Sequence, residues 1–177
     1  MSVSADPTHD LTGGISVHLR EQVRQDDLAA VRRITESSGF FQEAEIEVAV
    51  ELVQTRLSQG ATSGYHFLFA DAAPPAHLTI GYSCFGPIPC TQGSFDLYWI
   101  AVQNSYRRIG LGKLLLVKSE GIIRRMGGRR IYVETSSSSQ YEPTRIYYSR
   151  SGYLQQALIP DFYAPGDGKI IYVKEIL

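Results

Sequence analysis

The sequence has little of what marks exported, membrane-spanning or nucleic-acid-binding chains. Only two cysteines are present, and 17 basic against 18 acidic residues give a net charge of −1, so no basic surplus favours nucleic acid or a membrane surface. No apolar run reaches the roughly 18 residues of a membrane span, and the first residues lack the basic and apolar regions of a signal peptide. We therefore expect a cytoplasmic chain that binds no membrane and no nucleic acid in general. Cys84 and Cys90 are expected to be free thiols, and the alternative is that they pair in an oxidising compartment.

What the chain does have is the composition of an ordinary globular domain. Its 177 residues are 44% hydrophobic and 20% charged. A chain of this length can form one hydrophobic core but is too short for two domains with cores of their own. Residues 1–14 show no helical or strand-like periodicity. We expect residues 1–14 to form a flexible tail and residues 15–177 to form a single domain.

Alternating and helical periodicities predict the order of the elements along the chain. Strands are expected at residues 15–23, 65–70, 77–85, 95–102, 130–135, 153–160 and 169–176, and helices at residues 26–36, 42–57, 110–126 and 143–151. Two blocks of helices among strands with short connections predict a mixed α/β (α+β) fold. The unit over residues 95–135 should be a right-handed parallel crossover.

Residues 100–116, IAVQNSYRRIGLGKLLL, change from a strand to an amphipathic helix across a joint with two arginines and two glycines. A glycine costs a helix interior about 1 kcal/mol, so a pair of glycines here needs a reason. Amide groups at a helix N-terminus attract anions, and glycine lets a phosphate approach the backbone. Arg107, Arg108 and Lys113 add positive charge. The joint is therefore a candidate phosphate-binding loop, and the alternative is a helix start with incidental glycines.

Two common phosphate-binding motifs do not fit this joint. A P-loop needs a glycine where Arg107 stands and a serine or threonine where Leu114 stands. The dinucleotide-binding fingerprint needs a glycine where Leu115 stands. What remains is the pattern Arg107-x-x-Gly110-x-Gly112 after a strand that ends near residue 102.

That pattern resembles the R/Q-x-x-G-x-G/A motif of the GNAT superfamily of acyl-CoA-dependent N-acyltransferases. Residues 147–153, YYSRSGY, resemble the family's later Y-x-x-x-G-F/Y element through Tyr148, Gly152 and Tyr153. The order of the elements resembles that of the family over residues 15–177. The resemblance implies a central mixed sheet with a splayed parallel strand pair and helices on both faces.

The resemblance also implies acetyl-CoA as the acyl donor. A run of seven residues would hold the coenzyme A pyrophosphate. The pantetheine would lie between strands 95–102 and 130–135, against the backbone at the end of the first of these strands. The pyrophosphate residues are Arg107, Arg108, Ile109, Gly110, Leu111, Gly112 and Lys113, and the pantetheine residues are Ala101 and Val102. Splayed strands leave backbone groups that pantetheine amides can satisfy. The family often has an asparagine where Tyr141 stands, so any such contact must come from elsewhere, with residues 136–139 as candidates. No histidine has metal-ligand spacing, so no metal is expected.

Amide formation from a thioester needs a base for the amine and an acid for the leaving thiolate. Asp96 is the only charge in the strand FDLYWIAV, and alternation places it on the same face as Tyr98. It is a candidate base, with substrate binding and a purely structural role as alternatives, and Glu134 is the second candidate base. The resemblance implies that Tyr148 is the acid, and the alternative for this residue is a core aromatic.

The acceptor is expected to be an amine carried by a small molecule or a peptide. The resemblance places it between the first two helices and the last hairpin. Aromatic and acidic side chains there suit a cationic amine, although the same residues could be core aromatics and an exposed helix start. The candidate substrate-binding residues are Phe40, Phe41, Glu43, Tyr98, Glu134 and Tyr163. A non-catalytic acyl-CoA-binding or protein-interaction module on the same fold is the rival interpretation, and the resemblance makes a homodimer an expectation.

Overall fold

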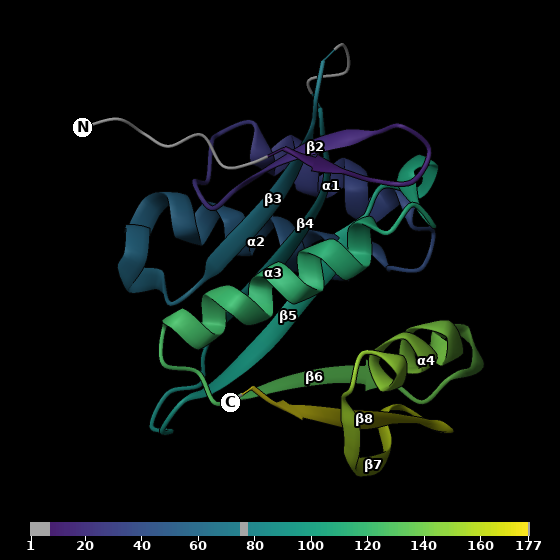
Figure 1. Ribbon diagram of the computed structural model, residues 1–177. Coiled ribbons are helices and arrows are strands. Elements are labelled where there is room, and N and C mark those ends of the chain that lie inside the picture. Colours follow the sequence, from purple (N-terminus) through teal and green to yellow (C-terminus); the bar gives the residue numbers. More distant parts are fainter. Residues whose placement is uncertain (1–7, 75–77, 177) are drawn as a thin grey trace. The chain divides into compact units, whose positions relative to one another are not determined.

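The computed structural model describes residues 8–74 and 78–176, and Figure 1 shows their helices and strands. The strands are β1 (His9–Asp10), β2 (Ser16–Arg20), β3 (His66–Ala72), β4 (Thr79–Pro87), β5 (Ser94–Val102), β6 (Arg130–Ser136), β7 (Leu154–Ala164) and β8 (Asp167–Glu175). The helices are α1 (Asp27–Ser37), α2 (Glu43–Gln59), α3 (Leu111–Arg125) and α4 (Glu142–Arg150), with 3₁₀ turns η1 (Gly60–Ser63), η2 (Asn104–Tyr106) and η3 (Ser139–Tyr141). Hydrogen bonds order the strands β1-β2-β3-β4-β5-β6-β8-β7. The expected mixed α/β class is confirmed.

Each predicted strand and helix is present, with its ends shifted by a few residues. The strand predicted from residue 77 begins at Thr79, and residue 77 itself lies outside the described residues. The last hairpin turn is tighter than expected, because Asp167 already pairs with Ala164. Strand β1 was not predicted, and it lies within the segment that we expected to be a flexible tail.

The chain divides into two compact units, which are described separately. Unit 1 comprises residues up to Phe85 together with Trp99–Ser119, and unit 2 comprises Gly86–Tyr98 and Glu120–Leu177. Strands β4 and β5 and helix α3 each contribute residues to both units. One domain over residues 15–177 stays a prediction.

The core of unit 1 forms where the apolar faces of α1 and α2 meet strands β3 and β4. Apolar residues recur every three or four positions along both helices, which gives each helix one buried stripe. Aromatic side chains of β3 stack at 5.5 Å between ring centroids. The core residues are Val31, Ile34, Ala49, Val53, Phe67, Phe69, Tyr82, Cys84 and Ala101.

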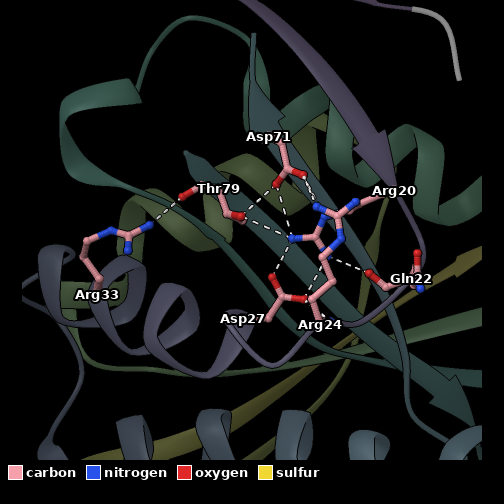
Figure 2. A network of polar contacts seen from close by, with 7 residues as sticks. All are labelled: Arg20, Gln22, Arg24, Asp27, Arg33, Asp71 and Thr79. Carbon is pink, nitrogen blue, oxygen red and sulfur yellow. Dashed lines mark hydrogen bonds and ion pairs between the residues drawn. The ribbon is translucent and has the colours of Figure 1, made fainter. Parts of the chain in front are cut away.

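Arg20, the last residue of β2, is the centre of a polar network in unit 1 (Figure 2). Its guanidinium donates to both carboxylate oxygens of Asp27 at the start of α1 and to Asp71 on β3. Thr79 on β4 donates to Asp71 and accepts from Arg20. The guanidinium also lies 4.4 Å from the centroid of the Phe69 ring. The side chains of Arg20 and Asp27 are 12% and 1% exposed. Largely buried charges therefore link β2, α1, β3 and β4.

Unit 2 contains the parallel strand pair that the sequence predicted. Strands β5 and β6 pair in parallel from Ser94–Arg130 to Asp96–Tyr132. β6 then pairs antiparallel with β8, and β8 with β7. The parallel register ends after Asp96, although both strands continue further. The pairing therefore covers only the first residues of both strands, and the splayed C-terminal ends stay a prediction.

Candidate active site

The loop between β5 and α3 has an unusual backbone. After the 3₁₀ turn η2, Arg108 adopts φ +63° and Gly110 adopts φ +91°. Left-handed backbone is rare for a residue with a side chain, whereas glycine adopts it readily. Helix α3 begins at Leu111, and its first bond runs from the Leu114 amide to the Gly110 carbonyl at 3.0 Å. A Cβ at Gly110 would have no other atom within 4 Å, so the space beside the loop is open.

This loop carries the properties of an anion site. The first amides of an α-helix have no partner within the helix, and the dipole adds partial positive charge there. Arg108 and Lys113 are exposed and Arg107 is half-buried, so three cations surround the start of α3. The sequence-based motif and the geometry therefore coincide at one place in unit 1.

The start of α3 is fixed by close packing on β4. A Cβ at Gly81 would lie 3.2 Å from the Ala101 carbonyl oxygen and from Leu111, and 3.1 Å from Leu115. Leu111 and Leu115 are 1% and 0% exposed. Gly81 thus lets β4 approach the end of β5 and the first turn of α3. Sequence reasoning missed it, although a glycine inside a strand often marks a close approach of this kind.

Three of the candidate acceptor residues lie in unit 1, and one of them, Phe40, lies beside this loop. Phe41, just before α2, packs edge-on against Trp99 with 4.9 Å between ring centroids. The Arg107 guanidinium lies 5.4 Å from the centroid of Phe40, which is 37% exposed. Glu43 forms an ion pair with Arg32 at 2.9 Å. Trp99 was not singled out from the sequence.

Unit 2 brings together the two candidate bases. Asp96 on β5 is half-buried, and Glu134 on β6 forms an ion pair of 2.6 Å with Lys169 on β8. The Lys169 ammonium lies 3.9 Å from the centroid of the Phe162 ring. Burial and then the negative charge of Glu134 raise the pKa of Asp96, while Lys169 opposes the increase. Tyr98 lies on the same strand face as Asp96 and is 39% exposed.

Tyr148 is the one buried residue of α4, at 4% exposed. Its ring packs edge-on against Tyr147 and Tyr153, at 5.3 and 5.4 Å between centroids. Burial, and then the neighbouring Tyr147, raise its pKa well above the usual value of a phenol. Gly152 adopts φ +86°, and the amide of Tyr153 donates to the carbonyl of Tyr148 at 3.1 Å. The glycine therefore ends the helix and returns the chain so that Tyr153 packs on Tyr148.

The segment after β6 is held by a further set of hydrogen bonds. Arg145 donates to the carbonyls of Ser136 and Ser138 at 2.8 and 2.7 Å. The Ser136 hydroxyl donates to Asp167 on β8. These bonds join α4 to the end of β6 and the segment after it, and the end of β6 to β8. On that hairpin Tyr163 is 49% exposed.

A hollow of about 580 Å³ in unit 1 is lined by members of the Arg20 network and their neighbours. Arg20, Arg33 and Asp71 contribute to its wall. None of the residues predicted for the site lies there, and the charges of Arg20 and Asp71 pair with each other. We therefore regard this hollow as a structural feature and place no step of the reaction in it.

The family model that matches the sequence is that of the acetyltransferase (GNAT) family, over residues 29–153. The chain belongs to this family. It is therefore an acetyltransferase, and the recognition made from its two motifs is confirmed. A solved structure from Desulfovibrio desulfuricans, assigned to the GNAT acetyltransferases, is 45% identical with a TM-score of 0.88, and the match covers 91% of this chain and 99% of the other.

Two more distant structures share the fold. The ribosomal-protein-S18-alanine N-acetyltransferase of Escherichia coli is 17% identical, with a TM-score of 0.68 over 90% of this chain and 94% of its own. An aminoglycoside 6′-N-acetyltransferase, solved with coenzyme A, is 16% identical, with a TM-score of 0.67 over 90% and 97%. No curated protein matches the sequence.

The remaining sequence-based expectations concern thiols, metals and membranes. Cys84 and Cys90 are both free, and Cys84 is buried. In the part of the chain that the structure describes, no cluster of histidine, cysteine and acidic residues is arranged to hold a metal. No helix in those same residues is both long and apolar enough to cross a membrane.

Proposed function

We propose that this acetyltransferase moves an acetyl group from acetyl-CoA to a primary amine by direct attack in a ternary complex. The observation that carries the proposal is the loop from Arg107 to Gly112. There the family motif, the left-handed backbone, three cations and the N-terminus of α3 coincide. The donor supplies the acetyl group as an activated thioester. Binding and proton transfer come from the residues of the chain.

The loop would hold the pyrophosphate of the donor, because helix-terminal amides and cations both favour a multiply charged anion. Gly110 leaves open space for it. The backbone of Ala101 and Val102 would hold the pantetheine amides, beyond the point at which the β5–β6 register ends. The Val102 amide is our candidate donor to the thioester oxygen, where a fixed N–H group stabilises developing charge.

Asp96 would accept the proton of the attacking amine. Its raised pKa strengthens it as a base at neutral pH, and its half-buried position keeps it accessible to a substrate or a bridging water. Glu134 is less suited, because Lys169 already occupies one of its oxygens at 2.6 Å. We expect Glu134 to tune Asp96 by its charge.

Tyr148 would donate a proton to the departing thiolate. Burial raises its pKa, so the phenol stays protonated throughout the usual working range of pH. The tyrosines packed around it hold the ring in place. A covalent route through Cys84 is disfavoured, because burial raises the pKa of its thiol and so disfavours the reactive thiolate.

The acceptor would be an amine-bearing small molecule or peptide that contacts exposed aromatic side chains. Phe40, Tyr98 and Tyr163 are each more than one-third exposed. Such rings attract a cation and cover apolar neighbours. The more distant relatives acetylate a ribosomal-protein alanine and an aminoglycoside, by their names, so both acceptor kinds belong in a first screen.

Calorimetric titration with acetyl-CoA tests the donor site. We expect micromolar binding by the intact protein and loss of that binding in Gly110→Trp, because the indole would fill the open space beside the loop. Gly127→Trp is the matched control, since Gly127 also has a positive φ and open space but lies beyond the other end of α3. No binding by the intact protein would overturn the proposal.

A second experiment separates an enzyme from a non-catalytic acyl-CoA-binding or interaction module. Tyr148→Phe removes only the hydroxyl, so turnover should fall by roughly 10²–10⁴-fold if it is the acid, while donor binding is retained. Tyr147→Phe, the neighbouring tyrosine, should leave turnover close to the original. Unchanged turnover in Tyr148→Phe would rule out the acid role.

A further inference from the structure

The N-terminal hairpin reaches the loop that would bind the donor. Between β1 and β2, the Leu11 amide donates to the Ile15 carbonyl at 2.8 Å, and Gly13 and Gly14 turn the chain with positive φ. This turn presents Thr12, whose hydroxyl donates to the Ile109 carbonyl at 2.8 Å across 97 positions of sequence. In Figure 1 the purple connection between β1 and β2 lies beside the teal loop that precedes α3.

The position of this bond in the loop gives it a specific consequence. Ile109 stands between the two left-handed residues, Arg108 and Gly110, so its carbonyl belongs to the peptide that links the strained backbone to α3. A peptide is planar and trans, so its C=O and N–H groups point in opposite directions. Holding the Ile109 carbonyl on Thr12 therefore turns the Gly110 amide away from Thr12. That amide belongs to the run proposed to hold the pyrophosphate.

The other end of the loop is held from a different element. The Asn104 amide donates to the hydroxyl of Ser37, the last residue of α1, at 3.0 Å. Within the loop the Tyr106 amide donates to the Gln103 carbonyl at 2.8 Å. Ser37 thus fixes where the loop begins. Thr12 fixes the peptide at its end, where the left-handed backbone of Arg108 would otherwise relax.

We propose that Thr12 is a positioning residue of the donor site. Its hydroxyl sets the orientation of the Ile109–Gly110 peptide, so that the Gly110 amide is already aimed before the pyrophosphate binds. This inference rests on the proposed function of the loop. It makes the N-terminal hairpin a working part of the donor site, whereas the sequence suggested a loose segment there.

The test compares Thr12→Val, which keeps the shape but loses the hydroxyl, with Thr12→Ser, which keeps the hydroxyl. One hydrogen bond corresponds to roughly a 3–10-fold change in affinity. Thr12→Val should raise the Kd for coenzyme A and the KM for acetyl-CoA by about that factor, with kcat unchanged, and Thr12→Ser should restore both. Thr8→Val is the control, because the Thr8 hydroxyl lies 3.3 Å from His18 and not on the loop.

A second donor makes the readout specific to the pyrophosphate. Acetyl-pantetheine lacks that group, so its kcat/KM should be the same in Thr12→Val and in the original protein, whereas general damage to the fold would lower both donors together. Equal losses for both donors, equal losses in the valine and serine variants, or original affinity in Thr12→Val would each overturn the inference and leave the proposed function standing. Failure of the original protein to bind coenzyme A would overturn both.

Discussion

Replacing Arg20 by methionine should be one of the most damaging single changes in unit 1. The substitution keeps an apolar stem of similar length and removes the cation. Asp27, at 1% exposed, would then keep the hydrogen bond that the Arg24 amide donates to it at 2.7 Å. Asp71 would keep Thr79, with the Arg24 guanidinium 3.7 Å away.

The magnitude follows from the burial of the charges. Removing one partner of a buried ion pair costs about 3–5 kcal/mol, because the other charge stays out of water without compensation. For a chain of this size each kcal/mol lowers the midpoint of thermal unfolding by about 2–4 °C. Arg20→Met should therefore lower the midpoint by about 6–20 °C. Arg20→Met combined with Asp27→Asn should recover part of this loss, since no buried carboxylate is then left at position 27.

Thermal unfolding followed by circular dichroism measures these midpoints. Arg32→Met is the matched control, because Arg32 also pairs with more than one carboxylate, those of Glu36, Glu43 and Glu47, but on the surface of the helices. Exposed pairs contribute little to stability, so its midpoint should stay close to the original. A loss in Arg20→Met no larger than in the control would refute the argument from burial.

Two further predictions concern the base and the packing of unit 2. Activity should need the ionised form of Asp96 and fall as the pH drops through its raised pKa. Glu134→Gln removes a negative charge and should move this acid limb of kcat/KM to lower pH, whereas Lys169→Met removes a positive charge and should move it to higher pH. Shifts of both variants in the same direction would contradict the assignment of Asp96 as the base. Gly128→Ala should lower the free energy of unfolding by roughly 1–3 kcal/mol, because the new Cβ would lie 2.8 Å from the Ile123 carbonyl oxygen. Gly121→Ala is the control and should not destabilise the protein, because the nearest atom to its Cβ would be 3.9 Å away. Denaturant titration of both variants measures the difference.

Local patterns explain how much of the fold could be predicted from the sequence. The helices and strands with a long apolar periodicity were all predicted, because burial of one face leaves a trace every two or every three to four residues. Strand β1 has two residues, too few for a period. The 3₁₀ turn η2 has only three residues. Such elements are set by their partners and not by their own composition.

The candidate site likewise has a part that local sequence predicts and a part that depends on long-range contacts. The motif from Arg107 to Gly112 is contiguous, so residue types made it a candidate anion site, and the family resemblance supplied the predicted pyrophosphate. The hydrogen bond from Thr12 to the Ile109 carbonyl joins positions 97 residues apart, so no local sequence pattern could predict it. The ion pair between Glu134 and Lys169 depends likewise on the register of β6 and β8.

That register bears on the choice between the two candidate bases. From the sequence, Asp96 was the first candidate base and Glu134 the second, but the partners of the two carboxylates could not be predicted. In the structure Lys169 sits 2.6 Å from Glu134, so an incoming ammonium would have to displace a cation already in place there. Asp96 instead has a pKa raised by burial and by the charge of Glu134. Lys169 thus occupies Glu134, while the pKa of Asp96 stays raised. The opposite pH shifts expected for Glu134→Gln and Lys169→Met follow from the opposite charges of these two residues.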